Sequence, residues 1–166
     1  MQVQQTTPVP TGCCPPFAPE PWDDKELHWN DKLFVKAQVR CLFHVPLGMG
    51  AKMATSTALI KAADAEGEAH LTLSDDQSPW HSEILIAVKK AVPGATMGTL
   101  SGTYLTKVFE GPFRDAGKWV KEMAGVVAAK GRALEKIYLG YTTCPKCAKA
   151  YGKNYVVLFA KVDPPA

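Results

Sequence analysis

The chain has 166 residues, a length typical of one domain, and 46% of them are hydrophobic, which excludes disorder throughout. Nineteen Lys and Arg against sixteen Asp and Glu give a net charge of +3, which is too small and dispersed for a nucleic-acid-binding face. The best apolar run, 155–160, is far short of the roughly 20 residues that span a membrane, so we expect neither nucleic acid nor membrane as a partner.

The first 30 residues form an N-terminal arm outside the predicted core. Six of the 13 prolines lie within residues 1–21, and this density excludes a helix or a central strand there. Two interpretations stay open, a solvated tail or an extended arm held on the domain by Phe17, Trp22 and Trp29, and we favour the second. Residues 1–11 are polar and lack the basic start of a secretory signal, so we expect a cytoplasmic protein.

From residue 31 onward the hydrophobic periodicity predicts strands alternating with helices. In chain order we expect a strand at 33–39, a helix at 49–66, strands at 70–74, 83–92 and 99–109, a helix between Pro112 and Gly131, and strands at 137–143 and 154–162. The strand at 83–92 is apolar on both faces, which indicates a central position in the sheet.

The predicted elements repeat. The two helix starts, near Met49 and Phe113, are 64 residues apart, and so are the glycines that end the helices, Gly67 and Gly131. We therefore expect one domain at 31–163, built from two βαββ repeats at about 31–92 and 99–163, with an insertion at 144–153 in the last hairpin. Such repeats predict an α+β fold with one antiparallel sheet, two helices on one face and a concave ligand cleft on the other.

Residues 102–113 read Gly-Thr-Tyr-Leu-Thr-Lys-Val-Phe-Glu-Gly-Pro-Phe, and a helix with Trp119, a glycine and Ile137-Tyr138-Leu139 follow them. This pattern resembles the GyrI-like (gyrase-inhibitor-like) family of small-molecule-binding, or effector-binding, domains over about 33–162. The resemblance implies a cleft at the junction of two βαββ repeats and ligands that are hydrophobic or cationic. Some stand-alone members of similar size hydrolyse reactive cyclopropane-containing natural products. This chain has Lys136 where relatives often have an acidic residue, which leaves the charge preference for the ligand open.

Aromatic residues cluster around the predicted junction, and rigid aromatic walls suit a flat apolar ligand. The candidate ligand-binding residues are Trp80, Tyr104, Phe109, Trp119, Tyr138 and Tyr141. Each of them also fits a place in the core, Trp119 above all, because it borders the packing face of its helix. We favour Tyr138, Tyr104 and Trp80 for the cleft.

Two carboxylates, Glu110 and Glu83, are the candidate catalytic residues. A glutamate beside aromatic rings can pair with a cationic ligand, or can activate water as a general base if burial raises its pKa. The alternatives are a favourable charge near a helix N-terminus for Glu110 and a solvated strand end for Glu83. The chain contains no GxSxG, Walker, GxGxxG or HExxH motif, so the common hydrolase, nucleotide-binding and zincin classes lack support.

Five unevenly spaced cysteines do not form a disulfide framework. Cys13 and Cys14 of the arm and Cys144 and Cys147 of the insertion supply four sulfurs, the number that a tetrahedral zinc site takes. A structural zinc or a thiol pairing, inert thiols and redox sensing all stay open. A thioredoxin-like role is disfavoured, because there the CxxC opens a helix, whereas this CxxC is expected in a hairpin loop. Cys41 reads as a buried residue.

The sequence therefore predicts a stand-alone protein that binds hydrophobic or aromatic xenobiotic or natural-product ligands, with hydrolysis of the ligand left open. Such a function requires no cofactor. The alternative is a zinc- or redox-responsive interaction protein that uses the four cysteines of the arm and the insertion. The oligomeric state stays open, and a homodimer is compatible with the pattern.

Overall fold

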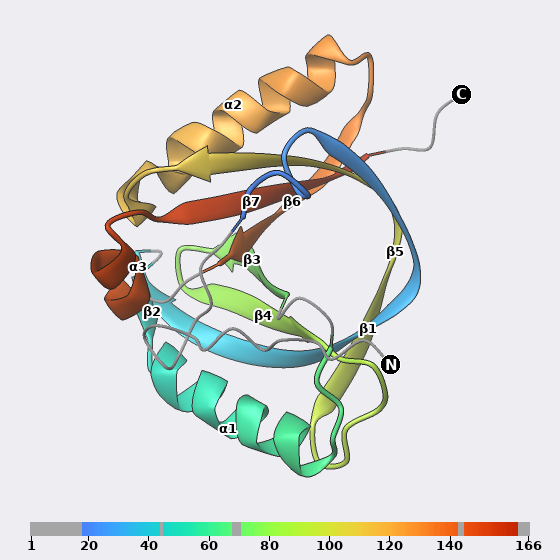
Figure 1. Ribbon diagram of the computed structural model, residues 1–166, viewed down its shortest axis with the longest axis vertical. Coiled ribbons are helices and arrows are strands. Elements are labelled where there is room, and N and C mark those ends of the chain that lie inside the picture. The colour runs from blue at the N-terminus through green and yellow to red at the C-terminus, as the bar shows by residue number, and fades with distance from the viewer. Residues whose placement is uncertain (1–17, 44, 68–70, 143–144, 163–166) are drawn as a thin grey trace, which may run out of the picture.

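The computed structural model describes residues 18–43, 45–67, 71–142 and 145–162 (Figure 1). The elements are β1 (Lys25–Leu42), β2 (Val45–Leu47), α1 (Met49–Ala62), β3 (Thr72–Ser78), β4 (His81–Ala87), β5 (Thr96–Glu110), α2 (Ala116–Ala129) after a short 3-10 turn, β6 (Leu134–Tyr141), α3 (Pro145–Tyr151) and β7 (Tyr155–Val162). The α+β class is confirmed. Without β2 and α3, the described elements follow the expected order of strand, helix, strand and strand, twice.

The sheet is antiparallel and closes on itself. Its strand order is β2-β1-β4-β3-β6-β7-β5, and β1 also pairs with β5, so six strands form a barrel. The expected concave face is therefore the inside of this barrel rather than one side of an open sheet. Helices α1 and α2 cover its outer surface on opposite sides (Figure 1), which confirms that both helices pack on one face of the sheet.

Strand β1 closes the barrel because it is long enough to pair on both of its edges. Residues 34–40 pair with β4, and residues 25–36 pair with β5. The sequence assigned residues 25–30 to the arm and started the strand at residue 33, so this boundary was wrong. The polar residues of this stretch concealed a strand whose partners lie more than 70 residues away.

A one-residue bulge keeps both halves of β1 in register with the barrel. The register with β5 shifts between Trp29 and Lys32, and within the bulge Asp31 has φ 50. The Asp31 amide donates a hydrogen bond to Oγ of Ser101 at 2.8 Å. Because side chains alternate along a strand, Trp29 and Phe34 would face opposite sides without the extra residue.

Two short elements were not predicted. Strand β2 contains Pro46, which lacks the amide donor of a central strand and is tolerated here because β2 pairs only with β1 in the sheet. Helix α3 begins at Pro145, a residue that fits the first helical turn, and continues through Ala148 and Ala150. It occupies most of the expected insertion.

Apolar side chains form three clusters. The cluster under α2 contains Leu105, Phe109, Trp119, Met123, Val127, Leu139, Val156, Leu158, Ala160 and Val162. The cluster beside α1 contains Val35, Ile60, Ala65, Val88 and Val92. The interior cluster contains Phe34, Leu73, Leu85, Ala87, Tyr104, Tyr138, Val157 and Phe159, with Trp22, Leu27 and Trp29 packed against it.

We expect Trp29→Ala to lower the free energy of unfolding by about 2–4 kcal/mol, because large aromatic truncations in packed sites cost about 3–5 kcal/mol and Trp29 is only partly buried. Its ring centroid lies 4.5 Å from that of Tyr104, 5.7 Å from Phe159 and 5.9 Å from Phe34. Urea denaturation measures the change. Trp80→Ala is the matched control, because Trp80 is 49% exposed and its loss should cost less than about 1 kcal/mol. Equal losses in the two variants would show that Trp29 does not help to close the barrel.

Candidate functional site

The inner face of the barrel carries a group of charged and polar side chains. Gln38 of β1 and Asp75 of β3 each lie opposite Glu83 of β4. Residues directly opposite in antiparallel strands share a face, with Cβ atoms about 4.5–5.5 Å apart. Glu83 and Asp75 each stand two residues from a member of the interior cluster, Leu85 and Leu73, and therefore face inward. The interior site, as we call it, consists of Lys36, Gln38, Asp75, Glu83, Lys136 and Tyr138.

Each carboxylate of the interior site has a basic partner. Asp75 Oδ2 lies 2.5 Å from Nζ of Lys136, and Glu83 Oε1 lies 3.5 Å from Nζ of Lys36. Gln38 Nε2 also donates a hydrogen bond to Glu83 Oε2 at 2.6 Å. The side chains of Asp75 and Glu83 are only 6% and 14% exposed. Because an unpaired buried charge is costly, the lysines are what allow these carboxylates to lie on the inner face.

Lys136 and Tyr138 both keep their protons at neutral pH. Burial alone would lower the pKa of Lys136, but its hydrogen bond to Asp75, with the charges of Tyr138, Asp75 and Glu83, raises the pKa above the ordinary value. Burial raises the pKa of Tyr138, the Lys136 charge lowers it in part, and Asp75 and Glu83 raise it further. The Lys136 ammonium also lies 5.3 Å from the centroid of the Tyr138 ring. The interior site thus combines carboxylates with a neutral hydroxyl.

Aromatic side chains continue the interior site into the barrel. The ring centroids of Tyr104 and Tyr138 are 6.3 Å apart. Tyr104 is fully buried, and the ring of Trp29 packs against it. Burial raises the pKa of Tyr104 to about 12, and the charges of Tyr138 and Glu135 add to the rise. Trp29, which the sequence placed in the arm, thus joins Tyr104 and Tyr138 in what we call the aromatic wall.

Gly140, two residues after Tyr138 on β6, does not leave open space beside it. A Cβ atom on Gly140 would lie 2.6 Å from Cε2 of Phe159. The phenylalanine ring of the neighbouring strand β7 fills the space. The glycine therefore serves close packing inside the barrel.

Phe109, Trp119 and Tyr141 lie outside the barrel wall, under or beside α2. The rings of Phe109 and Trp119 stack with centroids 5.8 Å apart, and Tyr141 meets Phe113 edge-on at 5.6 Å. Phe109 on β5 and Tyr141 on β6 stand an odd number of residues from Tyr104 and Tyr138, so their side chains face the other side of the sheet, and Trp119 is on α2. They belong to the outer core, which is the alternative that the sequence offered for every aromatic candidate and for Trp119 above all.

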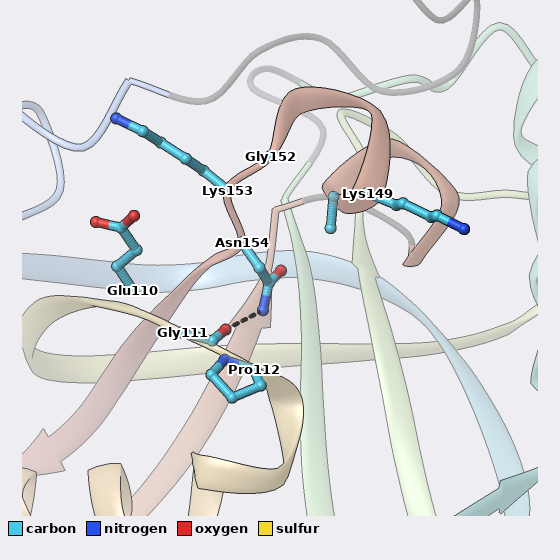
Figure 2. A pocket seen from close by; sticks show the side chains of 8 residues that line it. Glu110, Gly111, Pro112, Lys149, Gly152, Lys153 and Asn154 are labelled. Carbon is cyan, nitrogen blue, oxygen red and sulfur yellow. Dashed lines mark hydrogen bonds between the residues drawn. The ribbon is translucent and has the colours of Figure 1, made fainter.

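Glu110 and Glu83 do not share a site. Glu110 is exposed at the end of β5, at an open depression of about 370 Å³ lined by Glu110, Gly111, Pro112, Ala148, Lys149, Gly152, Lys153 and Asn154. Figure 2 shows the Glu110 and Lys153 side chains extending on one side, with Lys149 pointing away from them. Asn154 Nδ2 donates a hydrogen bond to the Gly111 carbonyl at 2.8 Å, which ties the strand ends together. The depression holds no aromatic lining residue.

Trp80 lies in the turn between β3 and β4 rather than at the start of a central strand. It is half-exposed, and its ring centroid is 5.1 Å from that of Phe43 in the β1–β2 turn. Of the eight predicted catalytic and ligand-binding residues, only Glu83, Tyr104 and Tyr138 come together on the inner face.

Sequence reasoning missed Asp75, Lys36 and Gln38. A signal existed for β1, where Phe34, Lys36 and Gln38 alternate with Leu33, Val35, Ala37 and Val39, so the polar residues share a face with Phe34. That face becomes the inner one only when the barrel closes. Asp75 gave no such signal, because Asp76 follows it and the pair reads as a solvated turn.

Of the proposed metal ligands, Cys13, Cys14 and Cys144 lie outside the described residues. Cys147 is fully buried in α3, and Cys41 is buried as expected, with a pKa raised by burial and by the charge of Asp76. Within the described ranges, no group of three or more His, Cys, Asp or Glu side chains could hold a metal ion. Cys147 lies between the paired strands β6 and β7 as expected, but this connection contains the short helix α3 rather than only a loop.

Comparisons with known proteins give a family and a fold. A family model for bacterial hydrolases matches residues 4–162. An uncharacterized conserved protein from Listeria innocua superposes with a TM-score of 0.63 at 12% identity, over 85% of this chain and 92% of that one. A hydrolase from Listeria innocua gives 0.61 at 13% identity, with the same coverage. The structure of SAV2435 bound to tetraphenylphosphonium gives 0.51 at 11% identity, over 85% of this chain and 94% of that one. At such identities the likeness shows the fold, and no curated protein matches by sequence.

Two of the five tyrosines should ionise late. Burial raises the pKa of both Tyr104 and Tyr141 to about 12 from the model-compound value of 10.0. Near-ultraviolet absorbance of tyrosinate during alkaline titration should therefore show a late phase, and Tyr104→Phe and Tyr141→Phe should each remove part of it. Since both folded pKa values exceed the unfolded one, the free energy of unfolding should fall as pH rises from 10 toward 12. A single phase at pH 10 in the folded protein would contradict the burial of both hydroxyls.

Proposed function

Since the chain belongs to the bacterial hydrolase family, we propose that it binds a hydrophobic or aromatic small molecule at the interior site and hydrolyses it there. The observation that carries this proposal is the placement of Glu83 on the inner face, beside the aromatic wall. Glu110, the other candidate, stands in an exposed depression without aromatic residues. The interior site therefore holds the catalytic carboxylate.

The proposed step is general-base catalysis by Glu83. A carboxylate oxygen of Glu83 takes a proton from water as the water oxygen forms a bond to an electrophilic carbon of the ligand. The bond from that carbon to its leaving atom breaks, and its electron pair goes to the leaving atom, which accepts the proton of the Tyr138 hydroxyl. The raised pKa of Tyr138 keeps that proton available. Lys36 and Gln38 hold the Glu83 carboxylate in position.

The aromatic wall sets the ligand class. The rings of Trp29, Tyr104 and Tyr138 pack against one another beside the charged group, and aromatic side chains of this kind suit a flat apolar ligand. SAV2435, which shares this fold, binds tetraphenylphosphonium, a cation with four aromatic rings. The resemblance to GyrI-like proteins further supports reactive natural products, including those with a cyclopropane ring, as substrates.

A pair of matched substitutions tests the catalytic role. We expect Glu83→Gln to slow hydrolysis of a cyclopropane-containing alkylating compound at least about 100-fold, the usual effect of losing a general base. Glu110→Gln should stay within about twofold of the unchanged protein, because its carboxylate lies outside the interior site. Product formation is followed by mass spectrometry.

Binding is measured separately, from the change in tryptophan fluorescence when tetraphenylphosphonium is added. Both variants should still bind it, which separates chemistry from binding. Loss of turnover in Glu110→Gln with full activity in Glu83→Gln would move the reaction to the depression. Neither turnover nor a fluorescence change with either compound in the unchanged protein would refute the proposal.

A further inference from the structure

Exposed large hydrophobic side chains are concentrated at one end of the protein. The described residues have six of them, and five lie in the β1–β2 hairpin and the β3–β4 turn. We call these five the hairpin patch: Leu42, Phe43, Val45, Leu47 and Trp80. They are 49% to 71% exposed, and the sixth, Leu134, is on β6. A contiguous group of this kind on a single chain indicates an interaction surface.

The hairpin patch is held together by pairing and ring contacts. Leu42 lies opposite Val45 in the hairpin, so both side chains face the same way. The rings of Phe43 and Trp80 are 5.1 Å apart. The Cys41 amide donates a hydrogen bond to the Trp80 carbonyl at 2.7 Å, which joins the hairpin to the neighbouring turn. The patch is thus presented by two connected turns that fix its shape.

The charged residues that flank the β1–β2 hairpin in the sequence are basic. Between Lys36 and Asp64 the sequence contains no Asp or Glu, whereas Arg40, Lys52 and Lys61 are exposed bases. Figure 1 shows that α1, which carries both lysines, follows β2 directly. Strand β3 adds one acid near its end, Asp76, whose Oδ1 accepts hydrogen bonds from Ser74 and Ser82.

A second copy of this chain, or a strand that pairs with β2, fits this surface poorly. Two copies that meet through it would bring their basic residues together, and like charges across an interface are unfavourable. Pairing through the free edge of β2 is weak as well, because the central residue of the three, Pro46, has no amide hydrogen. An anionic bilayer complements the patch in two ways. Its negative surface attracts the basic residues, and the apolar phase beneath that surface accepts the apolar side chains.

We propose that the hairpin patch docks the protein reversibly on an anionic membrane surface, with the apolar turns entering the headgroup boundary and Arg40 and Lys52 facing the lipid phosphates. The sequence excluded a membrane partner because it has no spanning segment, and no described helix is long and apolar enough to span one. Docking at the surface needs no such helix. The proposal is independent of the hydrolytic reaction.

Sedimentation with vesicles tests the docking. The full chain is mixed with sucrose-loaded vesicles made of phosphatidylcholine alone, or of phosphatidylcholine with about one third phosphatidylglycerol. Each Lys or Arg near an anionic surface adds about 1 kcal/mol to the binding free energy. We expect at least about tenfold stronger partitioning to the anionic vesicles. The double variant Leu42→Ser, Phe43→Ser removes apolar side chains that enter the headgroup boundary and should partition much less to the anionic vesicles, whereas Leu134→Ser, the matched control, should partition as the unchanged protein does. Unchanged melting temperatures show that both variants fold.

A second readout locates the contact. Of the four tryptophans, Trp80 is exposed, so phosphatidylglycerol with brominated acyl chains should quench its fluorescence, and Trp80→Phe should abolish that quenching. Equal partitioning of the double variant and the control would overturn the proposal. So would a dimer in the absence of lipid that the double variant breaks, because the patch would then bind a second copy.

Discussion

The closure of the barrel through β1 is the constraint on which the rest of the structure depends. One strand of 18 residues pairs with β4 on one edge and β5 on the other, and the bulge before Lys32 keeps its inward face continuous. Without the bulge, either Trp29 or Phe34 would leave the interior cluster. Closure also removes the two sheet edges that these strands would otherwise expose.

Closure explains why charged residues can stand beside aromatic ones on the inner face. A buried carboxylate is tolerated when a base neutralises it, and Asp75 has Lys136 at 2.5 Å while Glu83 has Lys36 and Gln38. The same surroundings raise the pKa values of Tyr138 and Tyr104, so their hydroxyls stay protonated. A carboxylate and a hydroxyl that keeps its proton thus share the inner face of the barrel.

Much of the fold followed from local patterns. The helices α1 and α2 were predicted from their composition. Gly131 follows the end of α2 as expected, whereas α1 ends at Ala62, five residues before Gly67, so the prediction that Gly67 ends this helix was wrong. Strand β5 was placed to within a few residues at each end. The two short extra elements and the start of β1 were not predicted. Strand β2 contains a proline, and α3 is only seven residues long. Residues 25–30 are mostly polar and form a strand only because β5 is there to pair with them.

For the site, the sequence determined which residues share a face and which chemistry they offer. Glu83, Tyr104 and Tyr138 were recognised as a carboxylate and two rings suited to a ligand. Phe109 was assigned to the same ligand site, although strand alternation puts it on the opposite face from Tyr104. Only the tertiary structure decided which face is inside. It set Glu83 beside Asp75 and Lys36, left Glu110 exposed, and brought Trp29 onto Tyr104. The physical reason is that alternation is local, with a period of two residues, whereas closure depends on pairing between residues that are 60 or more positions apart in the chain.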